Sequence, residues 1–277
     1  MSSGGSLMVE SFWGKLGLRV ATGLTLAFIY VPLGVIALYA FNETRTQTWP
    51  IKGLTLDWFD KALHNPGVRA ALLDSVKVAA GAMAIAIVLG TLAAFAVQRY
   101  RFFGRETVSF LVILPIALPG IVTGMALNAT FRTVLEPFGV GLGLFSVIVA
   151  HATFCIVVIY NNVLARLRRS ARSIEEASMD LGADTWQTFR YVTFPQLRTA
   201  LLAGGLLAFA LSFDEIIVTT FTAGPVQTLP IWIFVNLSRP NQLPIVNVVA
   251  VLVVLLSAIP VYLASRMTQE SGILRRR

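Results

Sequence analysis

Six long stretches of apolar residues constrain the fold of this chain more than any other feature. They cover approximately residues 20–41, 72–97, 108–129, 143–164, 200–221 and 245–264. Each is long enough for an α-helix to cross the hydrocarbon core of a bilayer, which needs about 20 residues. Charged residues make up 13% of the chain, against about 25% in soluble domains. We therefore predict an all-α membrane protein with six transmembrane helices.

The positions of lysine and arginine predict the orientation of these helices. Most of the basic residues fall in the segments that share one side of the membrane with both chain ends. Because cytoplasmic loops are enriched in Lys and Arg, we expect both termini in the cytoplasm. The first apolar run is longer than the roughly 7–15 apolar residues of a signal peptide, so we read it as an uncleaved helix. The expected parts are a cytoplasmic segment (1–19), a six-helix membrane domain (20–265) and a basic cytoplasmic tail (266–277).

The third apolar run contains two prolines four residues apart, Pro115 and Pro119. Each proline frees a backbone carbonyl, and a membrane helix tolerates this only where neighbouring helices or water satisfy the group. One interpretation is a kinked helix that lines a pathway, and the other is ordinary packing of a bent helix.

The cytoplasmic loop at residues 166–198, between the fourth and fifth runs, has the pattern of two short helices. Ser173 followed by Glu176 predicts a capping box at the start of the first helix. Gly182 is placed to end that helix in a left-handed conformation. Asp184 followed by Gln187 predicts the start of a second helix, and Pro195 limits its length. The apolar sides of both helices need a partner, either the membrane domain itself or a groove on another protein.

This loop resembles the EAA loop of permease subunits of binding-protein-dependent ABC importers. The motif runs from Glu176, through Gly182, to Pro195, with Ser178 in place of an alanine and Phe194 in place of a leucine. The resemblance implies the type I ABC importer permease fold and an EAA-type coupling loop that sits in a cleft of a cytoplasmic ATPase. The residues expected to couple to that ATPase are Glu175, Glu176, Ala177, Ser178, Asp180, Leu181, Gly182, Ala183, Trp186, Phe189 and Pro195.

Residues 212–234 most resemble the second permease of spermidine/putrescine-type importers. This resemblance implies that the chain forms half of a translocation pathway in the bacterial inner membrane. The implied solute is a small molecule of the polyamine class. The implied partners are a dimer of ATP-binding subunits, a second permease that is a paralogue, an extracytoplasmic solute-binding protein and the lipid bilayer. ATP and Mg²⁺ would be bound by the ATPase, and no cofactor or nucleic acid by this chain.

The fifth apolar run contains two adjacent acids, Asp214 and Glu215. A carboxylate at the bilayer centre costs about 2.5–3.5 kcal/mol, so the pair needs a reason. The neighbours of Glu215 on a helix include Ser212 and Thr219, which places it nearer a wet pathway, whereas the neighbours of Asp214 are apolar and indicate a subunit or helix contact. The pair is a cation site or gate, a structural pair near the outer surface, or two neutral acids. The predicted substrate pathway comprises Asp214, Glu215, Ser212, Thr219, Pro115 and Pro119.

Other function classes lack their motifs in this sequence. There is no GxxxxGK[ST] loop for ATP phosphates and no nucleophile–base–orienter set for catalysis. His151 and Cys155 are four residues apart, and two such residues without a third ligand indicate packing rather than a metal site. The remaining alternatives are a permease for another small solute and a proton-coupled secondary transporter. The latter would have no use for the cytoplasmic loop at residues 166–198, here called the docking loop.

The orientation is testable by cysteine labelling in intact cells. We expect a membrane-impermeant maleimide to modify a cysteine at Gln47, which follows the first run, and to spare one at Gln187 in the docking loop. The reverse labelling pattern would contradict the placement of both termini in the cytoplasm.

Overall fold

The computed structural model describes residues 12–273. Residues 1–11 of the predicted N-terminal segment and residues 274–277 of the predicted tail lie outside this range. The described part is all-helical apart from loops and one isolated bridge between Asn42 and Leu54. The helices are α1 Phe12–Ala40, α2 Asp57–His64, α3 Pro66–Arg99, α4 Arg105–Ala117, α5 Gly120–Thr130, η1 Phe131–Leu135, η2 Glu136–Phe138, α6 Leu144–Arg169, α7 Arg172–Asp180, α8 Thr185–Thr188, η3 Phe189–Thr193, α9 Phe194–Phe213, α10 Ile217–Thr222, α11 Leu229–Leu237, η4 Pro240–Gln242 and α12 Leu243–Ile273.

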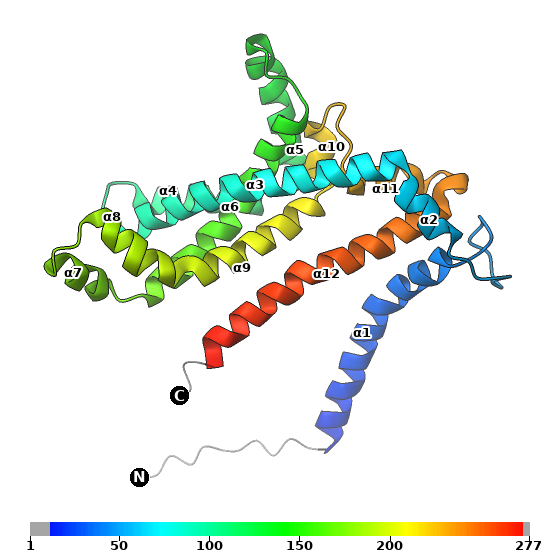
Figure 1. The fold of residues 1–277 in the computed structure, drawn as a ribbon, viewed down its shortest axis with the longest axis horizontal. Helices are drawn as coiled ribbons and strands as arrows, with labels where there is room; N and C mark the ends of the chain where they lie inside the picture. The colour runs from blue at the N-terminus through cyan, green and yellow to red at the C-terminus, as the bar shows by residue number, and fades with distance from the viewer. Residues whose placement is uncertain (1–11, 274–277) are drawn as a thin grey trace.

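The membrane helices confirm the predicted fold class. Within the described residues, five helical stretches are long and apolar enough to cross a membrane, and the bent pair of α4 and α5 makes six if it counts as one span. In Figure 1 the axes of α3, α6, α9 and α12 are broadly aligned, with α9 running opposite to the other three; α7 and α8 lie at one end and α2 and α11 at the other. The chain is therefore a multi-pass helical membrane protein with the loop between its fourth and fifth spans at one end of the bundle.

The core forms where α3, α6 and α9 pack together. Small residues of α3, among them Ala82, Ala86 and Ala94, share one buried cluster with Ile159 and Tyr160 of α6. Small residues let helix backbones approach closely, which stabilises membrane bundles through dispersion contacts. The tightest point is Gly90, where an added Cβ would lie 2.9 Å from both the carbonyl oxygen of Ile156 and the Cβ of Ile159.

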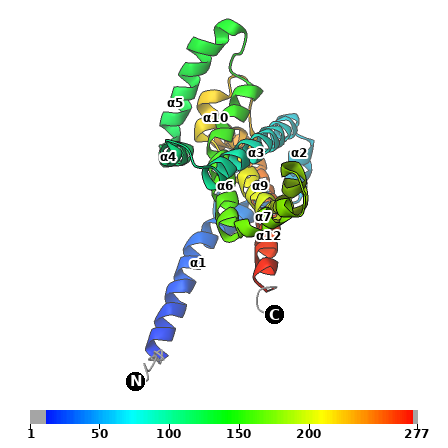
Figure 2. The same ribbon diagram turned by 90° about the vertical axis from the view of Figure 1, so that its left-hand side faces the viewer.

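The first helix stands apart from this core. Figures 1 and 2 show α1 projecting away from the bundle, which it joins near its C-terminal end. Residues 12–36 of α1 are all exposed, and the most apolar 18-residue window of the helix has no buried residue. An apolar helix with no cover in its own chain needs lipid or another subunit around it.

The helix ends differ from the ends of the apolar runs in three places. The helix α1 begins at Phe12 rather than near residue 20, so it extends into the predicted N-terminal segment. The fifth span does not continue to residue 221: α9 ends at Phe213, and α10 begins at Ile217 after a break. The basic tail is helical as far as Ile273, because α12 continues through it.

The third span is broken rather than kinked, with α4 and α5 bent by 105°. The break is at Leu118, whose ψ angle of 142° is extended. Proline disfavours helical geometry in the residue before it, so Pro119 accounts for this turn and caps α5. Pro115, by contrast, lies inside α4 without ending it.

The close approach of α3 and α6 predicts that Gly90→Ala destabilises the subunit. We expect a lower thermal midpoint in detergent, since overpacking a helix contact costs about 1–3 kcal/mol. The matched control is Gly23→Ala in α1, where an added Cβ has nothing within 4 Å and the gain in helix propensity is about 1 kcal/mol. Equal midpoints for the two variants would contradict the close packing at Gly90.

Candidate functional site

The loop between the fourth and fifth spans begins with α7, which ends in a well-defined cap. Gly182 has a φ of +92°, a left-handed conformation that costs little for glycine and more for residues with a Cβ. Its N–H donates to the carbonyl of Met179 (2.9 Å), and the N–H of Ala183 donates to that of Ser178 (3.1 Å). These two bonds form a Schellman motif. The prediction for Gly182 is confirmed.

The capping box at the start of α7 was predicted wrongly. The N-cap is Ala171, which makes no side-chain cap bond, and Ser173 already lies within the helix. Ser170, the residue before, donates a hydrogen bond to the side chain of Gln196 in α9. Arg166 at the end of α6 donates to the carbonyl of the same glutamine at 2.8 Å. These contacts fix the point where the chain leaves α6, and α7 therefore begins earlier than the sequence pattern indicates.

The second part of the loop is continuous with the fifth span. Asp184 caps α8: the N–H of Gln187 donates to its carboxylate at 2.7 Å, and its own N–H donates to the Gln187 side chain at 3.0 Å. This capping box is confirmed. However, α8 continues through the π turn η3 into α9, and Pro195 occupies the first turn of α9. The predicted second short helix is therefore the beginning of the fifth span, and α7 is joined to it directly.

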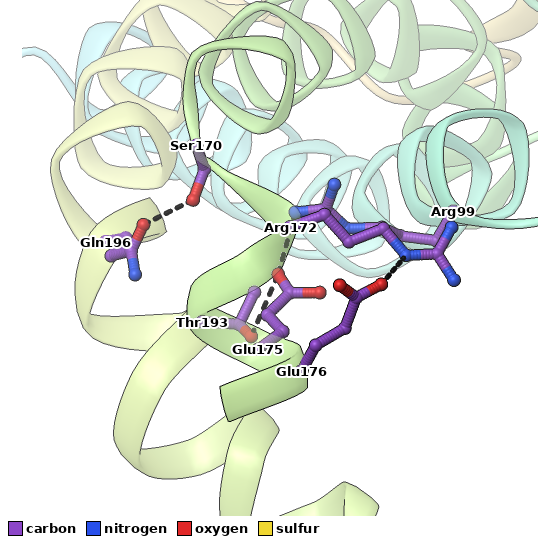
Figure 3. Close-up of polar contacts among 7 residues, drawn as sticks. All are labelled: Arg99, Ser170, Arg172, Glu175, Glu176, Thr193 and Gln196. Carbon is purple, nitrogen blue, oxygen red and sulfur yellow. Dashed lines mark hydrogen bonds and ion pairs between the residues drawn. The ribbon is translucent and has the colours of Figure 1, made fainter. Parts of the chain in front are cut away.

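An ion pair ties α7 to the membrane core. The Arg99 Nη2 of α3 lies 2.7 Å from the Glu175 Oε1 of α7, and the two side chains are only 12% and 15% exposed. The Thr193 hydroxyl donates to the same Glu175 oxygen at 3.3 Å. Figure 3 shows these side chains converging from the end of α3, from α7 and from the turn before α9. Glu175 thus links α7 to two spans at once.

The two adjacent glutamates of α7 differ in their surroundings. Glu176 pairs with Arg172 of the same helix at 3.0 Å, and both side chains are more than half exposed. A pair of this kind contributes little to stability, whereas breaking a buried pair by removing one partner is strongly destabilising. The anchor of the loop is therefore Glu175, and Arg99 is a partner that sequence reasoning counted only as a topology charge.

Large apolar side chains of α7, of the turn after it and of α8 are substantially exposed. Leu181 is 90% exposed, Trp186 64% and Ile174 49%. Ala177 and Asp180 are also exposed, whereas Ser178 and Ala183 are partly buried. Phe189 faces inward, with its ring 5.8 Å from that of Phe95 in α3. Of the predicted coupling residues, Leu181 and Trp186 are thus exposed apolar residues, whereas Glu175 and Phe189 contact α3 and hold the loop to the bundle.

The predicted acidic pair lies in the break between α9 and α10, not within a continuous helix. The Glu215 carboxylate accepts a hydrogen bond from the N–H of Val218 at 3.0 Å and so caps α10. Asp214 is exposed, and its carboxylate makes no hydrogen bond or ion pair within residues 12–273. The neighbour pattern had assigned the wet surroundings to Glu215. Among the described residues, Glu215 is the acid that is hydrogen-bonded within the chain, and Asp214 is the more exposed of the two.

Ser212 and Thr219 are buried rather than exposed to a path. Their hydroxyls lie 2.8 Å from the two ring nitrogens of His151, Ser212 at Nδ1 and Thr219 at Nε2. His151 was interpreted as a packing residue, and sequence reasoning missed its polar partners. The partners lie 61 and 68 residues further along the chain, so no local pattern could reveal them. Pro115 is partly buried in α4, and Pro119 is exposed at the bend.

The family described as binding-protein-dependent transport system inner membrane components matches residues 86–269. The chain belongs to this family. It is accordingly an ABC importer permease, a transport subunit rather than an enzyme, and it works with an ATPase and a binding protein.

Two relatives cover most of the permease. The putrescine transport system permease protein PotI of Escherichia coli (strain K12) is 34% identical over 235 residues, covering 83% of each chain. The spermidine/putrescine transport system permease protein PotC of Haemophilus influenzae is 32% identical, covering 89% of this chain and 94% of that protein. Among solved structures, a bacterial alginate ABC transporter in complex with its periplasmic protein has a TM-score of 0.72 at 14% identity, over 93% of this chain and 94% of that one. That likeness confirms the fold.

The geometry of the loop predicts that Gly182→Val impairs the permease while Gly182→Asn does not. Nothing lies within 4 Å of an added Cβ at Gly182, so the effect comes from the left-handed backbone alone, which asparagine tolerates and a β-branched residue does not. We expect loss of most solute-stimulated ATPase activity and uptake in the valine variant, measured in the reconstituted complex. Normal coupling in Gly182→Val would contradict a role for this cap.

Proposed function

We propose that this permease couples ATP hydrolysis by a separate subunit to the import of a small cation of the polyamine class. The observation that supports the coupling is the position of the docking loop, which is exposed on one side and held to the membrane helices on the other. Leu181 at the end of α7 and Trp186 of α8 are exposed, while Glu175 of α7 is held by Arg99 and Thr193. A surface that is uncovered on one side and rigidly attached on the other is suited to docking a partner and transmitting its movement.

The partners of the complex follow from this arrangement. A dimer of ATP-binding subunits holds ATP and Mg²⁺ and receives α7 in a cleft. A second permease, a paralogue as in the importers that the sequence resembles, forms the other half of the pathway. The exposed apolar α1 supports this partner, because it lies outside the bundle of its own chain. A solute-binding protein delivers the solute on the outer side of the bacterial inner membrane, with both termini of this chain in the cytoplasm.

Asp214 is the residue that we assign to the cation. Its carboxylate lies at the break in the fifth span, is exposed and has no partner within residues 12–273. A charge in a partly dehydrated path attracts an opposite charge more strongly than it would in bulk water. Linear polyamines carry spaced ammonium groups that suit such a site. The names of PotI and PotC, which include putrescine and spermidine, support the same solute class.

The assignment predicts different effects for the two acids. Asp214→Asn should raise the apparent KM for putrescine or spermidine by about tenfold, the equivalent of one charge-assisted contact of about 1.4 kcal/mol. Glu215→Gln retains an oxygen that accepts from Val218, so its KM should change little. The measurement is uptake of labelled polyamine by purified complexes in liposomes, with assembly checked by gel filtration.

Wild-type uptake of both polyamines with unchanged KM in Asp214→Asn would contradict the role of this carboxylate. A wild-type complex that transports neither polyamine would contradict the solute class, and uptake of another small solute would then identify the alternative permease.

A further inference from the structure

The break between α9 and α10 is held by one buried side chain of a third helix. His151 of α6 is completely buried, and its two ring nitrogens contact Ser212 before the break and Thr219 after it, each at 2.8 Å. The last backbone bond of α9 runs from the N–H of Asp214 to Ala210, and the first of α10 from that of Thr220 to Ile216. No helical ladder therefore joins the two ends, and His151 bridges them.

The hydrogen bonds of Thr219 determine the direction of this bridge. The Thr219 hydroxyl donates to the carbonyl of Glu215 at 2.7 Å, so it accepts from the ring, and Nε2 carries the proton. The opposite nitrogen, Nδ1, then accepts from the hydroxyl of Ser212. The neutral ring thus satisfies two buried hydroxyls and indirectly ties down the backbone of Glu215, the residue next to Asp214.

We propose that His151 is a positioning residue of the translocation pathway: by bridging Ser212 and Thr219 it holds the break open and keeps Asp214 facing out of the subunit. This rests on the role assigned to Asp214 in the proposed function. The helix α6 is suited to this role because 56% of its most apolar 18-residue stretch is buried. This is the largest buried share among the five long candidate spans within the described residues. Without the bridge, the buried Ser212 hydroxyl would lose its acceptor, while Thr219 would keep its bond to the carbonyl of Glu215. The segment would then move to satisfy the Ser212 hydroxyl.

The variant His151→Phe retains the ring volume and removes both hydrogen bonds. His151→Gln can restore the donor to Thr219, because its amide nitrogen lies near the position of Nε2. The matched control is Thr153→Val in the same helix, whose hydroxyl bonds only to the carbonyl of Ala150 at 2.6 Å. A cysteine at position 214, in a background with Cys155 replaced by alanine, reports the position of the break through its rate of modification by a water-soluble maleimide.

In the assembled complex, we expect His151→Phe to change the labelling rate at position 214 by about threefold or more, a shift within the range of one lost hydrogen bond. His151→Gln should restore part of the rate, and Thr153→Val should leave it unchanged. An unchanged rate in His151→Phe would overturn the proposal, whatever the solute, since labelling does not depend on transport.

Transport supplies the second readout. His151→Phe should raise the KM for putrescine with little change in maximal rate, and it should add nothing further in an Asp214→Asn background, because both changes act on the same contact. Additive effects of the two substitutions would overturn positioning through Asp214. If Asp214→Asn alone has no effect on KM, the assignment of the cation site fails, while the labelling result still decides whether His151 holds the break.

Discussion

The lipid interior offers no water to a polar group, and this constraint governs the structure of the whole permease. Backbone groups must bond within the chain at that depth, which makes the spans helical. It also sets a demand wherever a helix is interrupted. At residues 214–216, the Glu215 carboxylate caps α10, and His151 binds a hydroxyl on each side. At the other end of α10, Asn128 of α5 donates to the carbonyl of Phe221.

Two kinds of exposed side chain are suited to partners outside this chain. Asp214 is exposed at a break where the side chains of Ser212, Glu215 and Thr219 are hydrogen-bonded. Leu181 and Trp186 are exposed apolar groups at the opposite end of the bundle. The carboxylate of Asp214 is suited to a charged solute, and the apolar side chains of Leu181 and Trp186 are suited to a groove on another protein. The fifth span connects the two places, since the helix that starts at α8 in the docking loop ends at Phe213 beside the acidic pair.

The sequence predicted those features that depend on residues close together in the chain. Six apolar runs are local, and so are the glycine cap at 182 and the capping box at Asp184. The two helix breaks could not be predicted in the same way. The proline pair in the third span predicts a disturbed helix but not a bend of 105°. In the fifth span, no local pattern distinguishes Asp214–Ile216 from a continuous helix. The error at Ser173 had a tertiary cause, namely the contact of Ser170 with Gln196.

The contacts that define the two sites were out of reach of sequence reasoning. Arg99 and Glu175 lie 76 residues apart, and each had an ordinary explanation, one as a topology charge and the other as part of a loop motif. His151 likewise meets partners on two other helices. The greater exposure of Asp214 than of Glu215 was missed because of the same limit: helical periodicity assigned their neighbours correctly only as long as the helix was continuous.

The central claim is that the Arg99–Glu175 ion pair transmits movement from the docking loop to the membrane helices. Its most direct test is a charge exchange. We predict that Arg99→Glu and Glu175→Arg each abolish most of the solute-stimulated ATPase activity of the reconstituted complex, because each leaves two like charges in a largely buried site. The double variant should recover a large part of that activity. Normal activity in the single variants, or no recovery in a double variant that assembles, would contradict the claim.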